Sequence, residues 1–472
     1  MGSREVTDWQ GKNVTVAGLG VSGIPAAKAL HGLGANVTVV NDGDDARARE
    51  QAAGLEALGV TVRLGDGATL PEGAELVVTA PGWKPDKPLF TAARAAGVPI
   101  WGDVELAWRL RGPDAAPWLC VTGTNGKTTT TRMLASILEA AGLRTAAVGN
   151  IGVSLLDAVL GDERYDVLAV ELSSYQLHWA PSLRAHSAAV LNLAPDHLDW
   201  HGSMEAYAKD KGRVYEGNRV ACVYNVADKA TEDLVREADV EEGCRAIGFT
   251  LGAPAPSQLG VVDGILVDRA FVEDRQKNAQ ELAEVADVDP PAPHNIANAL
   301  AAAALARAFG VPPKAVRDGL RAFVPDAHRI AHVADVDGVA YVDDSKATNT
   351  HAAQASLAAY GSIVWIAGGL AKGATFDELV AESAERLRGV VLIGADRALI
   401  REALARHAPE VPVVDLDRTD TGAMSAAVQE ARRLAAEGDT VLLAPACASM
   451  DMFVNYNQRG DAFAQAVREL GT

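Results

Sequence analysis

Hydrophobic positions in the first part of the chain fall into short apolar runs separated by stretches of helical periodicity. Apolar runs at residues 13–17, 36–40 and 76–79 alternate with helix-like stretches that begin near residues 23 and 90. Short apolar runs bounded by turn residues are typical of buried strands, and their alternation with helical stretches indicates strand–helix–strand units. We therefore predict a parallel sheet with helices packed on it in this segment.

The same alternation continues through two further segments, each of which predicts another α/β domain. The strand candidates of the second segment are residues 118–121, 167–170, 188–193 and 220–224. An Ala/Leu-rich run at residues 298–309 is typical of a buried helix. The strand candidates of the third segment are residues 340–342, 363–366, 390–392 and 440–443. Its two main helix-like runs are residues 376–387 and 421–437.

A stretch containing prolines and a glycine at residues 112–117 separates the first two segments, as a linker would. A chain of 472 residues also exceeds the size at which one hydrophobic core keeps growing. We expect three α/β domains: a Rossmann-like domain at residues 1–112, a central domain with a P-loop ATPase-like parallel sheet at 113–324, and a C-terminal Rossmann-like domain at 325–472. We find no internal repeat and no low-complexity tract.

Composition narrows the class of protein. A hydrophobic content of 49% with 22% charged residues describes a globular chain, and the net charge of −19 argues against nucleic-acid and anionic-membrane partners, which require clustered Lys and Arg. No signal-peptide pattern and no apolar run of about 18 residues is present, so we expect a cytoplasmic protein without a membrane span. The four scattered cysteines form no Cys-x-x-Cys pair, which favours reduced thiols.

A glycine-rich turn joins the strand candidate at residues 118–121 to a helix-like run near residue 133. Its backbone N–H groups and the helix N-terminus would form a socket for phosphate. Lys127 would neutralise the outer phosphates, and the Thr128 hydroxyl would ligate Mg²⁺. The common spacing places a glycine at position 121, where this chain has Val. We predict ATP binding by Gly123, Thr124, Asn125, Gly126, Lys127, Thr128 and Thr129.

A second glycine pattern follows the first strand candidate of the chain. Gly18, Gly20 and Gly23 have the spacing of a Rossmann-like turn, and Asp42 follows the next strand about 20 positions on. Such a turn lets a diphosphate approach a helix N-terminus, and a mononucleotide diphosphate fits it as well as NAD does. The alternative is that the glycines serve only the tight turn.

Polar residues follow strand candidates of the second segment, at the edge where open parallel sheets bind their ligands. Glu171 ends one strand and is a natural Mg²⁺ ligand, because the metal prefers hard oxygen donors; the alternative is a solvated carboxylate. His197 lies between two aspartates and could orient a metal or its water, although a lone histidine is more often structural. Asn295 and Asn298 share one helical face. Helix capping explains one of them, whereas a contact to adenine or near the metal explains both.

Three loops of the third segment carry lysines or hydroxyls just after strand candidates. Lys346, Lys372 and Ser449 each occupy such a position. Any one of these loops alone is typical of an ordinary connection. Because the carboxyl ends of parallel strands converge, the three together predict a positive, hydroxyl-bearing pocket for an acidic substrate.

These motifs together resemble the ATP-dependent Mur ligases of peptidoglycan synthesis, and the resemblance covers nearly all of the chain. The loop at residues 123–128 is shared with the whole family and with folylpolyglutamate synthase. The other stretches that carry the resemblance are residues 18–23, 149–152, 171–177, 196–199, 344–349 and 445–453. Their combination is most similar to the D-glutamate-adding member, and the Asp-Asn-Pro-Arg signature of the diaminopimelate- or lysine-adding member is not present.

The resemblance implies a ligase that joins D-glutamate to UDP-N-acetylmuramoyl-L-alanine through an acyl phosphate and converts ATP to ADP and phosphate. It implies small-molecule substrates only, no nucleic-acid or membrane partner, and a monomer. In the ATP site it adds Asn298, Arg329 and Asp344. In the UDP-substrate site it implies Gly18, Val21, Ser22, Asp42, Gly82, Asn150 and Ser173, with Asn41 competing with Asp42 for the alignment.

The resemblance also implies the groups around the reaction. The catalytic residues would be Lys127, His197, Lys211 and Asn150. Two Mg²⁺ ions would be held by Thr128, Glu171, His197 and a carbamylated Lys211, although Lys209 is near enough in sequence to compete for the carbamate. Only a lysine with a depressed pKa could accept CO₂ in this way. The amino-acid pocket would contain Lys346, Thr348, Lys372, Ser449 and Tyr456, the last at a position where we expect Phe in close relatives.

Three alternatives stay open on the sequence. Another amide-bond ligase of the same superfamily, either an L-glutamate-adding Mur ligase or an enzyme similar to folylpolyglutamate synthase, would share the ATP loop, although the N-terminal Rossmann-like segment argues against the folate enzyme. A nucleotide-binding regulator would leave the lysine-bearing strand ends of the third segment unexplained. An NAD-dependent dehydrogenase accounts for the first glycine pattern but leaves the loop at residues 123–128 unused.

Overall fold

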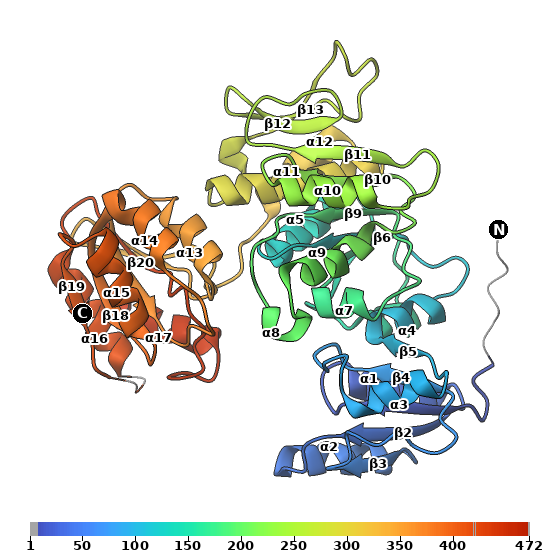
Figure 1. The fold of residues 1–472 in the computed structure, drawn as a ribbon. Coiled ribbons are helices and arrows are strands. Elements are labelled where there is room, and N and C mark those ends of the chain that lie inside the picture. The colour runs from blue at the N-terminus through green and yellow to red at the C-terminus, as the bar shows by residue number, and fades with distance from the viewer. Residues whose placement is uncertain (1–7, 419, 421, 471–472) are drawn as a thin grey trace. The chain divides into compact units, whose positions relative to one another are not determined.

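The computed structural model describes residues 8–418, 420 and 422–470, which form three sheets with helices packed on them (Figure 1). The α/β class with mainly parallel sheets is therefore confirmed. The chain divides into two compact units. The first comprises the described residues up to Val288 together with Ala297–Phe323, and it holds the first two sheets; the second comprises Asp289–Ile296 and the described residues from Val324 onward. The predicted domain boundaries after residues 112 and 324 stay predictions.

The first sheet is parallel throughout and has the strand order β3-β2-β1-β4-β5. In such sheets ligands bind beyond the carboxyl ends of the strands, where the strand order reverses. Gly18 follows β1 with a φ of 105°, and a Cβ at Gly23 would lie 1.9 Å from the Gly18 carbonyl oxygen, so both positions require glycine. The strands are β1 (Asn13–Ala17), β2 (Asn36–Asn41), β3 (Thr61–Leu64), β4 (Leu76–Thr79) and β5 (Ile100–Gly102).

Helices cover both faces of the first sheet. On one face Leu30 packs in a core with Val16, and on the other Phe90 packs with Val77. This burial of apolar side chains on both faces explains why the strands are almost uninterrupted apolar runs. The helices are α1 (Gly23–Gly32), α2 (Ala46–Glu56), α3 (Pro88–Ala95) and α4 (Asp103–Leu110).

The second sheet has nine strands in the order β14-β13-β12-β11-β10-β9-β6-β8-β7. All neighbours from β12 to β7 pair in parallel, so the carboxyl ends of β6, β8 and β9 lie side by side at one edge. The strands are β6 (Trp118–Thr122), β7 (Ala147–Gly149), β8 (Leu168–Glu171), β9 (Ser187–Val190), β10 (Ala221–Asn225), β11 (Arg245–Phe249), β12 (Gln258–Val262), β13 (Ile265–Asp268) and β14 (Gln280–Glu284).

One end of the second sheet departs from the purely parallel sheet that the sequence predicts. β13 pairs antiparallel with both β12 and β14, and a two-residue turn joins β12 to β13. Asp263 and Gly264 form this turn at φ angles of 49° and 78°, the positive pair that a type I′ hairpin requires. β14 is mostly polar and exposed, so it carries little of the apolar signal on which the sequence prediction rests.

The helices around the second sheet begin earlier than their apolar runs. α5 begins at Lys127 instead of near residue 133, because a row of threonines forms its first turn. α11 begins at Pro293, and a proline suits the first turn of a helix because no backbone N–H is needed there. The helices are α5 (Lys127–Ala140), α6 (Leu155–Leu160), α7 (Ser174–His178), α8 (Leu198–His201), α9 (Met204–Gly212), α10 (Lys229–Glu237), α11 (Pro293–Ala308) and α12 (Pro313–Ala322).

The third sheet has the order β15-β16-β20-β17-β18-β19, and only β15 runs antiparallel to its neighbour. Apolar cores cover both faces, with Trp365 in one and Phe463 in the other. The elements are β15 (Ala331–Val336), β16 (Val339–Asp343), α13 (Thr350–Leu357), β17 (Ile363–Gly368), α14 (Asp377–Ser383), β18 (Leu387–Ile393), α15 (Arg397–His407), β19 (Val413–Asp415), α16 (Ala423–Leu434), β20 (Thr440–Leu443) and α17 (Tyr456–Leu470). Within the described residues, no helix combines the length and the apolarity needed to cross a membrane.

Candidate active site

The predicted phosphate loop lies between β6 and α5. Gly123 and Gly126 adopt φ angles of 150° and 83°, so both rely on the conformational freedom of glycine. A Cβ at Gly126 would lie 2.4 Å from the Asn298 side-chain oxygen, which places the predicted nucleotide residue Asn298 directly against the loop. The Lys127 ammonium donates to the carbonyl oxygens of Gly123 and Thr124 at 2.9 and 2.8 Å. The loop therefore combines exposed backbone with a cation at the start of a helix.

Side chains from later segments hold the loop in place. The hydroxyls of Thr124 and Tyr207 lie 3.0 Å apart, and Tyr207 belongs to α9. The Asn192 side chain, just beyond β9, accepts from the Asn125 N–H at 2.8 Å and donates to the Asn125 carbonyl at 3.1 Å. Thr128 and Thr129 lie in the first turn of α5. The loop geometry thus depends on residues about 70 to 80 positions further along the chain as well as on its glycines.

Glu171 ends β8 beside the loop, where it is almost fully buried. Its Oε1 accepts from the Asn150 amide at 2.9 Å, and its Oε2 has no hydrogen-bond partner among the described residues. A buried carboxylate oxygen without a partner is costly unless a cation or a donor faces it. A Cβ at Gly149 would lie 2.3 Å from the Glu171 carbonyl oxygen, so glycine is required for this close approach.

Lys211 projects from α9 toward the same place. It is 2% exposed, and its ammonium donates to the Gly123 carbonyl at 2.8 Å and to the Thr122 hydroxyl at 3.4 Å. Burial, together with the charge of Lys127, lowers the pKa of Lys211 well below its ordinary value. Lys209, the competitor in the sequence, is exposed. The two lysines therefore differ sharply in burial, which favours the unprotonated amine that carbamylation requires.

His197 lies in the loop after β9, with a positive φ of 54°. Its ring lies 4.9 Å from the Tyr175 ring, and its Nε2 is 3.5 Å from an Asp196 carboxylate oxygen. Burial lowers the pKa of His197; Asp196 opposes this shift, and the charges of Lys127 and Lys211 reinforce it. His197 is therefore close enough to both lysines to sense their charge, and the imidazole is kept neutral at physiological pH.

The donors in this region fit magnesium better than a transition metal. Among the described residues no group of three or more His, Cys, Asp or Glu side chains is placed to hold a metal ion by itself. The unpartnered Glu171 oxygen and the Thr128 hydroxyl are hard oxygen donors, and magnesium is usually held by one or two carboxylates together with substrate phosphates. The residues present thus fit an ion that completes its coordination with the nucleotide.

Four of the predicted UDP-substrate residues, Gly18, Val21, Ser22 and Asp42, lie just beyond the carboxyl ends of β1 and β2 in the first sheet. The Ser22 hydroxyl donates to Asp103 at 2.9 Å, and Asp42 forms an ion pair with Lys87 at 2.5 Å. Val21 is 89% exposed, which leaves it available to a ligand. The Asn41 side chain, the competitor of Asp42, accepts from the Leu19 N–H at 3.1 Å, so it supports the glycine turn.

Of the other residues in this group, Gly82 contacts a loop of the second sheet, and Ser173 lies in a loop of that sheet. The Gly82 carbonyl accepts from the Trp200 indole at 3.2 Å, three residues after His197. The neighbouring Lys84 donates to the Asp199 carbonyl at 2.7 Å. Ser173 accepts from the Gln176 N–H and caps α7 directly after Glu171. The loop after β4 and the loop after β9 therefore meet.

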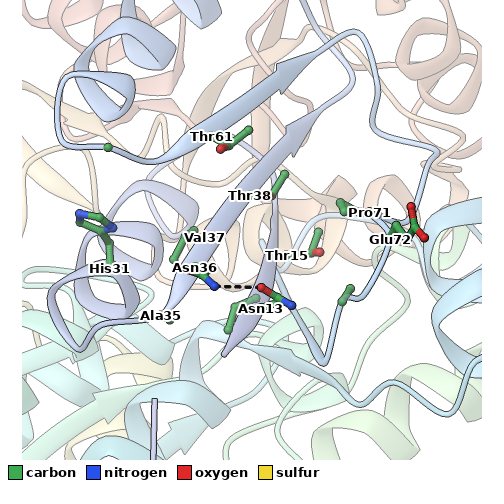
Figure 2. A pocket seen from close by; sticks show the side chains of 13 residues that line it. Asn13, Thr15, His31, Ala35, Asn36, Val37, Thr38, Thr61, Pro71 and Glu72 are labelled. Atoms are coloured by element: carbon green, nitrogen blue, oxygen red, sulfur yellow. Dashed lines mark hydrogen bonds between the residues drawn. The ribbon is translucent and has the colours of Figure 1, made fainter. Parts of the chain in front are cut away.

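A polar cavity of ≈ 200 Å³ lies elsewhere on the first sheet (Figure 2). Thr15, Thr38 and Thr61 stand in register on neighbouring strands, and the Asn36 amide donates to Asn13 at 3.1 Å. These residues lie toward the amino-terminal halves of their strands, away from the ends that carry Gly18 and Asp42. No residue of the predicted sites lines this cavity.

The predicted amino-acid pocket lies at the strand ends of the third sheet. The Lys346 ammonium lies 3.9 Å from the centre of the Tyr456 ring, so the aromatic face stabilises the cation. Ser449 is buried in the loop after β20, whereas Lys372 is exposed in the loop after β17 at a positive φ of 50°. The two loops are joined by a backbone bridge between Leu370 and Ala448. Thr348 lies two residues beyond Lys346, whose carbonyl accepts from its N–H at 2.8 Å.

The predicted nucleotide residues Arg329 and Asp344 lie in the same unit as this pocket. Burial raises the pKa of Asp344 to about 6, although a hydrogen bond from Ser356 and the charge of Arg329 oppose the shift. Arg329 lies 3.6 Å from Asp326. Asp344 is therefore close to half-ionised near pH 6 and fully ionised only above it.

One arginine that the sequence does not single out organises this pocket. Arg459 of α17 is 1% exposed and donates to the Ser345 hydroxyl and carbonyl and to the Cys447 carbonyl, at 3.0, 2.8 and 3.1 Å. Burial lowers its pKa to about 10. Arg459 thus ties the loop that carries Lys346 to the loop that carries Ser449. No spacing rule links it to either loop.

A buried carboxylate near Lys211 also escapes sequence reasoning. Asp210 accepts from His178 and His201 at 2.8 and 3.0 Å and from Arg213 at 3.1 Å. Burial alone would raise its pKa, but these donors hold the pKa at about 2. The partners come from separate segments, so no local pattern announces them.

Comparisons with known proteins agree with this geometry. Two family models match the chain, the Mur ligase middle domain over residues 121–306 and the Mur ligase glutamate ligase domain over residues 328–447. UDP-N-acetylmuramoylalanine–D-glutamate ligase of Streptomyces avermitilis is 89% identical over 466 residues, which cover 99% of this chain and 100% of that enzyme. The chain belongs to the Mur ligase family. Enzymes of the same name from Streptomyces coelicolor and Thermobifida fusca are 87% and 60% identical, each with 98% of this chain and 99% of theirs covered.

Solved structures share the fold of this Mur ligase chain. A pseudomurein peptide ligase type C from Methanothermus fervidus has a TM-score of 0.57 at 17% identity and covers 97% of this chain and 100% of its own. UDP-N-acetylmuramate–alanine ligase from Thermotoga maritima has a TM-score of 0.53 at 18% identity, with 97% and 99% covered. At these identities the likeness concerns the fold alone. Membership of the Mur ligase family confirms the predicted family and implies the use of ATP and Mg²⁺.

Proposed function

We propose that this Mur ligase joins D-glutamate to UDP-N-acetylmuramoyl-L-alanine at the expense of ATP, in the synthesis of peptidoglycan precursors. The observation that carries the proposal is the meeting of the phosphate loop with Glu171 and Lys211 at one edge of the second sheet. It is supported by the relative from Streptomyces avermitilis, which bears this name and matches the chain over its full length.

The first chemical step activates a carboxylate, because oxide is too poor a leaving group for direct amide formation. The substrate carboxylate attacks the γ-phosphorus of ATP, which gives an acyl phosphate and ADP. Catalysis of such a transfer is mostly positioning and charge neutralisation. The N–H groups of the loop at residues 123–128 and the N-terminus of α5 bind the phosphates, and the Lys127 ammonium neutralises them.

The acceptor carboxylate is positioned beside Glu171. Asn150, which already hydrogen-bonds Glu171, presents an exposed amide at the strand end where this carboxylate arrives. Thr128, Glu171, His197 and Lys211 would hold two magnesium ions. When bound, magnesium supplies neutralisation of the carboxylate and phosphate charges and aligns the two groups.

Lys211 acts as a carbamate in this proposal. CO₂ adds to the unprotonated amine, and one proton leaves, so that a cation becomes an anionic oxygen donor. The buried position and the depressed pKa of Lys211 favour the unprotonated amine, whereas Lys209 is exposed. The carbamate oxygens would then face the same cations as the unpartnered Glu171 oxygen.

The second chemical step forms the amide bond. The unprotonated amine of D-glutamate attacks the acyl carbon, phosphate leaves, and the amine loses its proton. Lys346 and Lys372 neutralise the glutamate carboxylates, with Thr348, Ser449 and Tyr456 completing the pocket. The UDP moiety of the other substrate lies on the glycine turn at Gly18, beside Ser22 and Asp42.

Phosphate release from ATP tests the proposal directly. Purified protein supplied with Mg²⁺ should release phosphate when UDP-N-acetylmuramoyl-L-alanine and D-glutamate are both present, and mass spectrometry should detect one amide product per phosphate. L-glutamate should replace D-glutamate poorly. A lack of stimulation by the substrate pair would contradict the proposal, and a preference for L-glutamate would transfer it to another ligase of the family.

A matched pair of lysine variants tests the carbamate. Lys211→Ala should lose activity that added short carboxylic acids partly restore, because they supply the missing oxygens. Lys209→Ala, two residues away but exposed, should retain activity within about twofold, as expected for a surface substitution. Loss of activity in Lys209→Ala with retention in Lys211→Ala would reverse the assignment, and a lack of rescue in Lys211→Ala would contradict the carbamate.

A further inference from the structure

Asp210 lies at the centre of a buried hydrogen-bond cluster next to the catalytic edge. One of its oxygens accepts from both His178 and His201, at 2.8 and 3.0 Å, and the other accepts from Arg213 at 3.1 Å. The His201 ring continues the chain, because its second nitrogen lies 2.9 Å from the Ser174 hydroxyl. Both carboxylate oxygens therefore have hydrogen-bond partners, and the cluster links side chains from several segments.

The order Ser174–His201–Asp210 has the hydrogen-bond sequence of a hydrolytic triad, but burial rules out that function. Ser174 is 2% exposed, and the His201 side chain is 0% exposed. A nucleophile must reach its substrate, and a hydroxyl enclosed in this way cannot. The cluster therefore serves the protein rather than a ligand.

Three members of the cluster belong to three different catalytic segments. Ser174 begins α7, three residues after Glu171. His201 ends α8, four residues after His197. Asp210 precedes Lys211 in α9. One carboxylate thus connects the segments that present three of the four proposed metal ligands, Glu171, His197 and Lys211.

We propose that Asp210 is a positioning residue that sets the relative placement of Glu171, His197 and Lys211. This inference rests on the proposed function, since it assigns to those residues the roles given above. α8 and α9 are short, with four and nine residues, and short helices depend on tertiary contacts for their position. Without Asp210, the histidines and Arg213 lose their common acceptor, and α9 loses its link to α7 and α8, although the contact between Tyr207 and Thr124 still holds it to the phosphate loop.

The variant Asp210→Asn tests the inference, because it preserves size but removes the charge. We expect kcat to fall roughly 10- to 100-fold, since displacements near 1 Å at a reaction centre cost on this order. The KM for D-glutamate should stay unchanged, because its proposed pocket is built from other segments. Carbon-13 NMR with labelled bicarbonate should show a weaker carbamate signal than in the unmodified protein.

Asp268→Asn provides the matched control. Asp268 is also buried and pairs with Arg307 at 2.9 Å, but its hydrogen bonds within the described part of the chain involve none of the proposed catalytic residues. Both variants should lower the unfolding temperature, whereas only Asp210→Asn should lose kcat and carbamate signal. If Asp210→Asn fails to fold, His178→Phe removes only one donor to the same oxygen. It should lower kcat and the carbamate signal to a smaller extent and leave the KM for D-glutamate unchanged.

Full kcat and full carbamate signal in folded Asp210→Asn or His178→Phe, with a lowered unfolding temperature, would overturn the inference and leave a purely structural role. Equal loss of kcat in Asp268→Asn would overturn it as well. The proposed function fails separately, if the unmodified protein shows no substrate-dependent phosphate release.

Discussion

Two sites at the ends of parallel strands, one in each unit, are built by different means. In the second sheet, side chains hold the strand-end loops together, as in the contacts between Thr124 and Tyr207 and between Asn150 and Glu171. In the third sheet, the loops after β17 and β20 meet through backbone bonds, and Arg459 binds mainly carbonyl oxygens. Backbone contacts tolerate many side chains, whereas side-chain contacts require particular residues. The site of the second sheet, which side chains hold together, therefore leaves stronger motifs in the sequence.

The two sites also differ in the task that each performs. The site of the second sheet has to stabilise transferring phosphate, so the ammonium groups of Lys127 in α5 and Lys211 in α9 lie against its phosphate loop, and the two side chains are partly and fully buried. The proposed pocket of the third sheet has only to hold an amino acid, and Lys372 is exposed. Substitutions in the first site should therefore affect kcat, and substitutions in the second should affect KM. Four predictions, in order of decreasing effect, test this division.

Lys127→Ala should have the largest effect. The ammonium is the one loop side chain that can neutralise the outer phosphates, and loss of such a cation lowers kcat on the order of 10³-fold. Calorimetric titration with UDP-N-acetylmuramoyl-L-alanine should show binding close to that of the unmodified protein, because the predicted UDP site lies on the first sheet. Loss of both turnover and binding would mean that the two sites are not separate.

Arg459→Lys should act on the other site. A lysine ammonium cannot satisfy the three acceptors that the guanidinium reaches in one plane. We expect the KM for D-glutamate to rise about tenfold, with kcat little changed. Arg468→Lys, on the exposed side of the same helix, is the control and should behave like the unmodified protein. A kcat effect as large as that of Lys127→Ala would abolish the division between the sites.

Two histidines, one in each unit, should change stability in opposite directions with pH. Burial lowers the pKa of His186, in the first unit, to about 4, so the unfolded state binds an extra proton between pH 6.5 and 4 and stability falls as pH drops through this window. A hydrogen bond to Asp343 raises the pKa of His328, in the second unit, so its contribution is complete below pH 6.5 and is lost as pH rises through the raised pKa.

Unfolding by urea at pH 5, 7 and 9 measures both responses. In His186→Gln, the fall in the free energy of unfolding between pH 7 and pH 5 should be smaller by about 1–2 kcal/mol. His328→Gln should flatten the loss between pH 7 and 9 instead. If the free energy of unfolding depended on pH in the same way in both variants, the assignment of His186 to the acid side and His328 to the alkaline side would be wrong.

Tyr456→Phe should have the smallest effect. The ring that faces Lys346 is retained, and a cation–π contact needs only the aromatic face. The KM for D-glutamate should change less than about twofold, whereas Tyr456→Leu should raise it further. A large effect of the phenylalanine variant would show that the hydroxyl itself contacts the substrate.

The sequence predicts those features that local patterns encode. The apolar runs and the glycine turns locate the sheets and the phosphate loop, because burial and positive φ angles restrict residue choice at each position. β14 escapes prediction because its polar sequence resembles a loop. Asp210 and Arg459 escape for another reason: no spacing rule links them to partners such as His178 and Ser345, which lie 32 and 114 residues away, and only the folded structure brings these together. The choice between Lys209 and Lys211 likewise depends on burial, which two lysines so close in sequence cannot reveal.

The Asp263-Gly264 turn makes the edge of the second sheet a natural place for protein engineering. The turn is exposed, and no heavy atom lies within 4 Å of a Cβ placed on Gly264. β12 is separated from β6 by four strand spacings, or about 20 Å, so an inserted peptide would stay clear of the phosphate loop. An affinity tag or fluorophore at this turn would allow the ligase to be immobilised or followed in single-molecule work with its reaction edge left open.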